Sequence, residues 1–390
     1  MTEREIPLDA GLDPNECADN GQSLLTDACR AGDAARVALL LERGAMENIR
    51  GEKRALRDWE IPLLCAAKSG SAECVRLILA AGANPDIKSI DGYTALTQAA
   101  SPEVVRALVE AGADVNAAVD EFEDTLGFVI SSVPNSDHIC GEYAEQTREL
   151  ISKKLAVAQA LVEAGADLRR LNQYGWTRLY AAAFWTNDIV VEWLLRQGEV
   201  PSARQVDGQT PLFACCWGMS SMSALDSGKT ATARIIGLLI EAGNDVNAED
   251  RSGNTPLHIA AHRCDHVPSS DGANPLAVRA LLEHGADPNL RNAKGETPLI
   301  VAAQGVWLDK SRGLECVQLL LAHGADPTLR DAGGRCALDY AEDSYRYWNK
   351  KFDSTSAEIS TEEQDRQQTT IRCIAECIKI LKEEAKPDSR

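Results

Sequence analysis

Apolar positions recur along the chain in a fixed arrangement. A leucine is followed three and four residues later by two small residues, as in PLHIAA at 256–261 and PLIVAA at 298–303. A second apolar run then ends at a glycine, as in LLEHGA at 281–286. Because each run can bury one face of a helix, every unit is predicted to fold as two antiparallel helices.

The unit repeats along most of the chain. The leucine before the small pair lies at Leu25, Leu63, Leu96, Leu126, Leu179, Leu212, Leu257, Leu299 and Leu338. The glycine that ends the second run lies at Gly44, Gly82, Gly112, Gly165, Gly198, Gly243, Gly285 and Gly324. These positions predict nine units, of which the last is incomplete or divergent.

The two intervals in the repeat behave differently. The distance from a glycine to the next leucine is constant in seven of eight cases, as from Gly82 to Leu96, and only the interval 44–63 is longer. The distance from leucine to glycine within a unit varies widely, from the short 96–112 to the long 126–165. The connection between units therefore sets their stacking, and extra residues are expected between the two helices of a unit, where closing a longer loop costs little.

These units resemble ankyrin repeats, whose pattern runs from T-P-L-H through paired alanines to L-L and G-A-D. The likeness covers roughly residues 20 to 342. It implies an all-α solenoid of about nine stacked helix pairs with short β-hairpin or turn connections. The expected domains are an acidic tail at 1–20, a repeat domain at 21–342 and a divergent capping region at 343–390, which includes an amphipathic helix near 369–384.

Five insertions are expected to form loops between paired helices, on the edge opposite the hairpins. They span 132–154, 218–230, 263–274, 305–313 and 344–368. Either this edge is functional or the insertions are neutral additions, and the sequence alone leaves both interpretations open.

Composition limits the classes of partner. The formal net charge is −19, with 44% hydrophobic and 25% charged residues. Such a charge argues against a nucleic-acid partner, which requires a basic surface, and suits a basic protein partner or serves only solubility. No apolar run is long enough to predict a membrane span, and the segment 1–20 lacks the pattern of a secretory signal. We therefore expect a cytoplasmic monomer with no cofactor.

A histidine cluster in HIAAHRCDH at 258–266 raises the question of a metal site. The resemblance assigns His258 to the last letter of T-P-L-H, where the imidazole ties neighbouring turns together. A site built from His262, Cys264 and His266 stays as an alternative. Most of the 12 cysteines occupy small-residue positions inside helices, so we interpret them as buried apolar residues rather than nucleophiles or disulfides.

The resemblance also implies which positions face a partner: those beside the hairpin glycine and those after the paired alanines. These positions hold Tyr93, Glu121, Glu123, Gln173, Tyr174, Trp176, Phe184, Trp185, Trp217, Arg251, His262 and Arg263. Aromatic residues make up only 5% of the chain, yet four of these positions in unit five are aromatic. Exposed aromatic side chains contribute much of the energy of protein interfaces. The alternative is that the insertion at 132–154 covers them.

The sequence thus predicts a non-catalytic module that binds a specific protein through units five to seven and the inserted loops. A sharper version is an immunity-type inhibitor of a basic toxin or enzyme. A scaffold or adaptor subunit and a metal-dependent protein are the remaining alternatives. The shared architecture does not choose among them.

Overall fold

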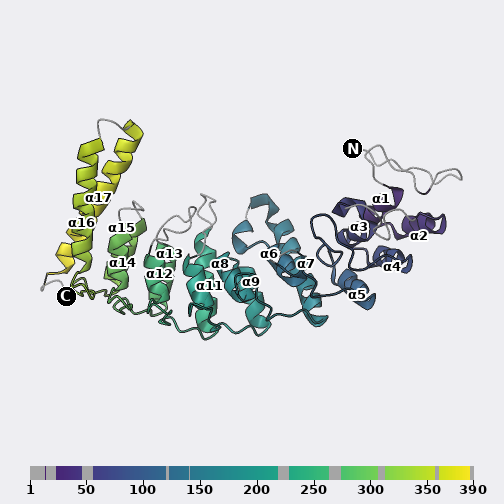
Figure 1. Ribbon diagram of the computed structural model, residues 1–390, viewed down its shortest axis with the longest axis horizontal. Helices are drawn as coiled ribbons and strands as arrows, with labels where there is room; N and C mark the ends of the chain where they lie inside the picture. The colour runs from purple at the N-terminus through teal and green to yellow at the C-terminus, as the bar shows by residue number, and fades with distance from the viewer. Residues whose placement is uncertain are drawn as a thin grey trace. The chain divides into compact units, whose positions relative to one another are not determined.

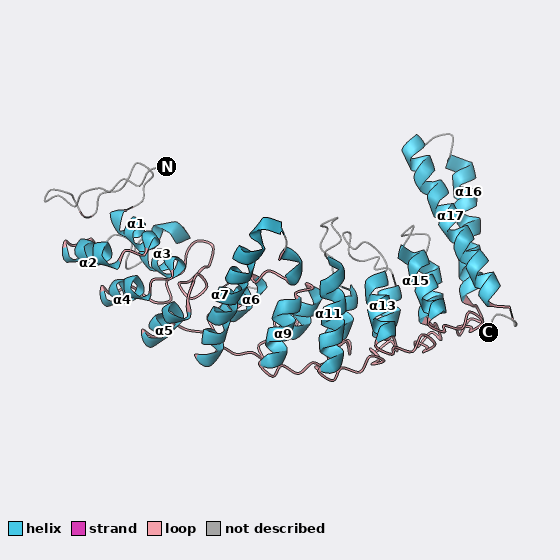
Figure 2. Ribbon diagram, turned by 180° about the vertical axis from the view of Figure 1, so that it is seen from behind, coloured by secondary structure: helices cyan, strands magenta, loops and turns pink. Residues whose placement is uncertain are grey.

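The computed structural model describes residues 14, 23–45, 56–119, 123–139, 141–217, 228–262, 274–305, 312–355 and 360–386. The chain divides into two compact units, one formed by 1–133 with 139–174 and the other by 134–138 with 175–390. Figure 2 shows helices joined by turns in the described part, where no strand is present and one isolated bridge joins Ala118 and Asp124. The predicted all-α class is confirmed, with tight turns in place of strands.

The first unit holds repeats one to four. Its elements are α1 (Leu24–Ala31), α2 (Ala34–Glu42), η1 (Asp58–Glu60), α3 (Pro62–Ser69), α4 (Ala72–Ala80), α5 (Pro102–Glu110), α6 (Thr125–Ser131), η3 (Gly141–Tyr143) and α7 (Ala144–Glu163). The first helices of successive repeats pack together, as α1 on α3, and the second helices form their own row through α2, α4, α5 and α7.

The second unit contains the residues of the predicted repeats five to nine. Its elements are η2 (Ser136–His138), α8 (Arg178–Phe184), α9 (Asp188–Arg196), α10 (Pro211–Trp217), α11 (Gly228–Glu241), α12 (Pro256–Ala261), α13 (Pro275–Glu283), α14 (Pro298–Gly305), α15 (Arg312–Ala322), α16 (Ala337–Thr355) and α17 (Thr361–Glu384). Figure 1 shows these helix pairs side by side, with the turns between repeats along one edge. One row runs through the even-numbered helices α8 to α16, and the other runs through α9 to α17.

Capping residues fix where the helices begin and end. Thr255 caps α12 by accepting the His258 backbone N–H, and Pro256 follows at the first helical position, where its missing N–H costs nothing. Each glycine after a second helix has positive φ, for example +85° at Gly285. These glycines therefore adopt the left-handed conformation that commonly ends a helix.

Backbone hydrogen bonds between neighbouring turns explain the constant interval between each glycine and the next leucine. The Ala293 N–H donates to the Ser252 carbonyl at 2.9 Å, and the Ala332 N–H donates to the Lys294 carbonyl at the same distance. At the turn of repeat seven, a Cβ on Gly253 would lie 2.9 Å from the Ala293 nitrogen. A residue added here would break this register, whereas a residue added between paired helices would not.

Two of the five insertions, 132–154 and 344–368, differ from the expected loops, and most of 218–230, 263–274 and 305–313 lies outside the described residues. Much of 132–154 extends the second helix of repeat four, because α7 is 20 residues long where α5 has nine. Residues 344–355 continue α16, and α17 begins at Thr361 rather than near 369. The expected domain boundary at 342–343 therefore lies inside a helix. Figure 1 shows α16 and α17 as a long helical pair at the end of the second unit.

Repeat three departs from the expected pair of helices. Residues 95–98 form a turn, and only the second helix, α5, is present. The interval from Leu96 to Gly112 is shorter than that from Leu63 to Gly82 by nearly one helical turn. The first segment of this repeat is therefore too short to form a helix.

Candidate protein-binding site

A chain of four aromatic rings lies along the first helix of repeat five. Trp176 precedes α8, and Tyr180 and Phe184 follow at intervals of four, which places the three on one face of the helix. The ring centroids of Trp176 are 5.1 Å from Tyr180 and 5.0 Å from Phe184. Phe184 meets Trp185 edge-on at 5.2 Å. Each distance lies within the range of favourable aromatic pairs.

Tyr180 anchors this chain of rings in the core. Its side chain is buried, and its hydroxyl donates a hydrogen bond of 3.1 Å to Oε1 of Gln209 in the next repeat. Burial raises the pKa of Tyr180, so the phenol stays protonated as a donor. Tyr180 occupies the position that His258 holds in repeat seven, and it ties two repeats together in the same way.

The rings become more exposed away from this anchor. Trp176 and Phe184 are half-buried, and the Trp185 side chain is 57% exposed. In the next repeat Trp217 is half-buried at the position equivalent to Phe184, and its indole N–H has no acceptor among the described residues. We call Trp176, Phe184, Trp185 and Trp217 the aromatic face.

The structure identifies a further residue beside this set. Val206, two positions before the turn glycine of repeat six, is 77% exposed. Ile90 holds the equivalent position in repeat three and is 60% exposed. A large apolar residue at a turn position that holds polar residues or alanine in the other repeats was the available signal, and examining that position in every repeat would have found both.

The other predicted partner-facing residues are distributed as follows. Gln173, Tyr174, Arg251 and His262 are exposed, while Tyr93 and Glu123 are half-buried. Tyr93 packs against Phe128 at 5.3 Å, and Glu123 accepts a hydrogen bond of 3.2 Å from Ser131. Tyr93, Glu123, Gln173 and Tyr174 belong to the first unit, whereas the aromatic face, Arg251 and His262 belong to the second. Glu121 and Arg263 lie outside the described residues.

Part of the 132–154 insertion docks beside the aromatic face. Residues 134–138 belong to the second unit, where the Asn135 side-chain amide donates to the Thr186 carbonyl at 3.2 Å. The Ser136 N–H donates to Oδ1 of Asp188 at 3.0 Å. Asp188 is fully buried and also accepts a 2.6 Å contact from Arg234. Trp185 keeps its exposure although these contacts lie next to it in the sequence.

The histidine cluster has a structural explanation in its first member. Nδ1 of His258 accepts the Thr255 N–H at 3.1 Å, and Nε2 lies 3.0 Å from the Glu296 carbonyl, to which it donates. Burial lowers the pKa of His258 and favours this neutral form. Both ring nitrogens are therefore engaged, as the resemblance implied. His262 is exposed at the end of α12, while Cys264 and His266 lie outside the described residues.

Eight of the nine described cysteines have the expected buried environment, and Cys373 is half-buried. The buried ones are Cys29, Cys65, Cys74, Cys215, Cys216, Cys316, Cys336 and Cys377. Burial raises the pKa of Cys377 to about 12, which disfavours the reactive thiolate. No group of three or more His, Cys, Asp or Glu side chains with metal-binding geometry occurs in the part of the chain that the structure describes. Within the same residues, no helix is both long and apolar enough to cross a membrane.

Known proteins show the same repeat. A family model described as ankyrin repeats (3 copies) matches residues 50–118, 222–331 and 266–348, just over half of the chain. The chain is 27% identical over 312 residues to the E3 ubiquitin-protein ligase KEG of Arabidopsis thaliana, covering 62% of this chain and 18% of the ligase. It is 26% identical over 205 residues to the ankyrin repeat protein YahD of Escherichia coli (strain K12), covering 51% of this chain and 88% of that protein.

A human relative extends the same likeness. The ankyrin repeat and SOCS box protein 16 of Homo sapiens is 29% identical over 203 residues, which cover 51% of this chain and 39% of that protein. The chain thus spans less than half the length of two of these three relatives. What they share with it is the repeat, and repeat proteins of this kind are generally non-catalytic interaction modules. The chain belongs to the ankyrin repeat family.

Proposed function

We propose that the chain is a non-catalytic binding module that holds an apolar segment of a protein partner on the aromatic face. The observation that carries this proposal is the exposure of Trp185 at the end of a packed chain of rings. A rigid aromatic side chain that is already ordered loses little entropy on binding and displaces much water. Val206, on the following turn, would extend the contact.

Charge suggests the surroundings of that apolar segment. With a net charge of −19, the protein attracts basic partners and speeds their encounter. An inhibitor of a basic toxin or enzyme would fit this charge and is the sharper form of the proposal. A scaffold or adaptor role is the second candidate, favoured by the exposed Tyr347 on α16 as a separate surface for recruitment.

The test compares the partners captured from source cells by the wild-type chain and by two variants. Trp185→Ala removes the most exposed ring, and Trp176→Ala/Trp185→Ala removes both tryptophans from the chain of rings. Tyr347→Ala tests the second candidate and gives a matched comparison, because it deletes an aromatic side chain of similar exposure, 59%, on α16. All variants must first show the same thermal unfolding as the wild type.

We expect a partner that the wild type and Tyr347→Ala retain and both tryptophan variants lose. An alanine at a buried interface anchor costs about 2 kcal/mol or more, which is roughly a thirtyfold weaker affinity. A partner retained by the double variant would contradict the proposal and assign binding to another surface. Loss with Tyr347→Ala alone would favour the adaptor role.

A further inference from the structure

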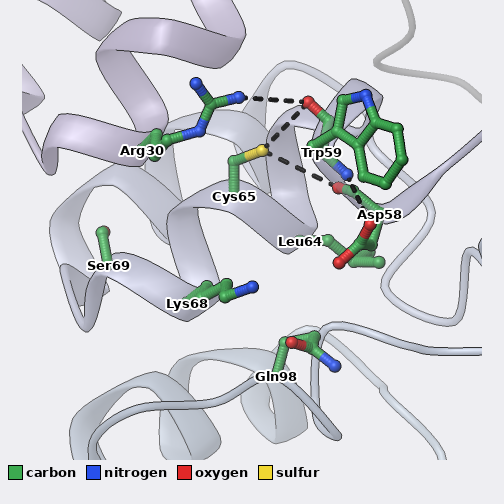
Figure 3. Close-up of a pocket in the computed structure, with 8 residues that line it drawn as sticks. All are labelled: Arg30, Asp58, Trp59, Leu64, Cys65, Lys68, Ser69 and Gln98. Atoms are coloured by element: carbon green, nitrogen blue, oxygen red, sulfur yellow. Dashed lines mark hydrogen bonds between the residues drawn. The ribbon is translucent and has the colours of Figure 1, made fainter.

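A pocket of about 200 Å³ lies in the first unit, away from the aromatic face in the sequence (Figure 3). Arg30 of α1 stands on one side, and Asp58 and Trp59 of η1 form another. The rest of the lining comes from Gln98, in the turn that replaces the first helix of repeat three, and from four residues of α3: Leu64, Cys65, Lys68 and Ser69. Its volume is comparable to that of one large side chain.

The tryptophan wall of the pocket is held from several sides. Trp59 is 42% exposed, and the Arg57 guanidinium lies 5.0 Å from its ring centroid. Its backbone N–H donates to Oδ1 of Asp58 at 3.0 Å, and its carbonyl accepts the Cys65 thiol at 3.5 Å and Arg30 at 3.5 Å. Figure 3 shows the contacts of Trp59 with Arg30, Cys65 and Asp58 on one side of the pocket. Because the Trp59 backbone is held by these hydrogen bonds and Arg57 lies over the ring, a ligand would lose less energy in ordering this residue.

The two basic side chains of the pocket, Arg30 and Lys68, differ in whether they have an acidic partner. Arg30 already forms a pair with Asp27 at 3.0 Å, but Lys68 has no anionic partner within the described residues. Figure 3 shows the Lys68 side chain extending along the pocket towards the side of Asp58 and Gln98. Asp58 uses one oxygen for the Trp59 N–H. Lys68 and the Gln98 amide are thus available donors above an apolar wall of Trp59 and the buried Leu64.

The place of Arg30 and Lys68 in the repeat also supports a binding role for this pocket. Arg30 and Lys68 lie five residues after the leucine of repeats one and two, the position that Phe184 and Trp217 hold in repeats five and six. The same structural position therefore changes from basic to aromatic along the chain. Two cations at this position stand out in a protein with a net charge of −19.

We propose that this pocket is a second docking site, which receives one acidic side chain from a peptide segment. The carboxylate would be bound by Lys68 and the Gln98 amide, and the methylene groups would pack on Trp59 and Leu64. The charge of Asp58 opposes an anion, so its removal strengthens binding. This site does not depend on the aromatic face.

Three blocked peptides test the proposal on the full chain: acetyl-Gly-Leu-X-Leu-Gly-amide with X as glutamate, glutamine or lysine. The indole N–H signal of Trp59 in NMR spectra reports binding, and a Trp59→Phe variant assigns it among the seven tryptophans. Saturable shifts are expected with the glutamate peptide, at an affinity about tenfold higher than for the other two. Lys68→Gln is expected to weaken the glutamate peptide about tenfold, and Asp58→Asn to strengthen it.

Two controls separate this result from folding and from the aromatic face. Lys294→Gln removes an exposed lysine of the second unit, and Trp176→Ala/Trp185→Ala removes the two tryptophans of repeat five; both should bind the glutamate peptide like the wild type. Tighter binding of the lysine peptide, unchanged binding by Lys68→Gln, or no shift of the Trp59 signal with any peptide would each overturn the proposal. None of these outcomes would bear on the aromatic face.

Discussion

The pair between Asp188 and Arg234 allows a quantitative test of how repeat five is held. Asp188 has no exposed surface, whereas the Arg234 side chain is 44% exposed. Arg234 also contacts Glu192, so it keeps a carboxylate and access to water if Asp188 is neutralised. Removing Arg234 instead leaves a buried carboxylate with the Ser136 N–H as its remaining contact across elements. The two substitutions should therefore have unequal effects.

The expected changes in the free energy of unfolding follow from this difference in exposure. Breaking a fully buried ion pair costs roughly 3 to 5 kcal/mol. Because Arg234 is partly exposed, we expect Arg234→Met to lower the free energy of unfolding by about 2 to 3 kcal/mol. Asp188→Asn should cost about 1 to 2 kcal/mol, since an amide oxygen can still accept the Ser136 N–H. The double variant should show a coupling of about 1 kcal/mol or more.

The assay is urea unfolding followed by circular dichroism, with hydrogen exchange of 134–138 as a local readout. Hydrogen exchange is needed because repeat arrays can unfold in more than one step. Arg279→Met is the control: Arg279 pairs with Glu315 at 3.5 Å across two repeats, and both side chains are about half exposed. Arg279→Met should lower the free energy of unfolding by only about 0 to 1 kcal/mol. Equal effects of the two Asp188–Arg234 substitutions, or simple additivity in the double variant, would refute this reasoning.

Three further predictions follow from single positions. Because burial lowers the pKa of His258, the unfolded state takes up the proton first as the pH falls. The free energy of unfolding should therefore be highest above about pH 6.5 and decrease below it. His258→Gln should reduce this dependence on pH, as urea unfolding between about pH 5 and 8 would show. By the same assay, Gly295→Ala should lower the free energy of unfolding by about 2 to 4 kcal/mol and Gly324→Ala by about 1 to 2 kcal/mol. Both glycines have positive φ, but only a Cβ at 295 would lie 2.8 Å from a backbone nitrogen. In native α17, Cys377 should be alkylated much more slowly than half-buried Cys373, as mass spectrometry of the labelled peptides would show; equal rates would contradict the burial argument.

Local rules were sufficient to predict the repeat itself. The left-handed caps at Gly243 and Gly285, and the two hydrogen bonds of His258, depend on residues that the repeat pattern identifies. The packing of first helices on first helices follows from the same pattern, because each apolar face must be covered by the next unit. These features could be predicted from short stretches of sequence.

The insertions required a different argument. The interruption of the repeat predicts a loop at 144–154. These residues are nevertheless rich in helix formers, and Lys153 pairs with Glu149 one turn away at 2.7 Å. Weighing helix propensity within the insertion would have predicted the longer α7. Similarly, the short interval of repeat three already indicated that one helix lacked the residues to form.

Contacts between segments far apart in the sequence were beyond such rules. Asn135 and Ser136 reach Thr186 and Asp188 at separations of 51 and 52 residues. No periodicity links these positions, because the loop that carries the first pair has no counterpart in other repeats. The same is true of the exposure of Trp185: the pattern indicated its position, but its fractional exposure depends on how neighbouring segments pack.

The position five residues after the leucine tolerates many kinds of side chain without loss of the fold. It holds Arg30, Lys68, Phe184, Trp217 and His262 in different repeats, a wide range of charge, size and shape, and none of these side chains is fully buried. Buried positions of the same helices carry mainly small or aliphatic residues, with larger exceptions such as Tyr180, Phe213 and His258, since each is enclosed by neighbouring repeats. Because packing in the core does not restrict the residue at this position, its side chain can vary to suit a binding partner. Substitutions there should therefore change binding more than stability, and this is why the basic pocket and the aromatic face can be tested in a chain that stays folded.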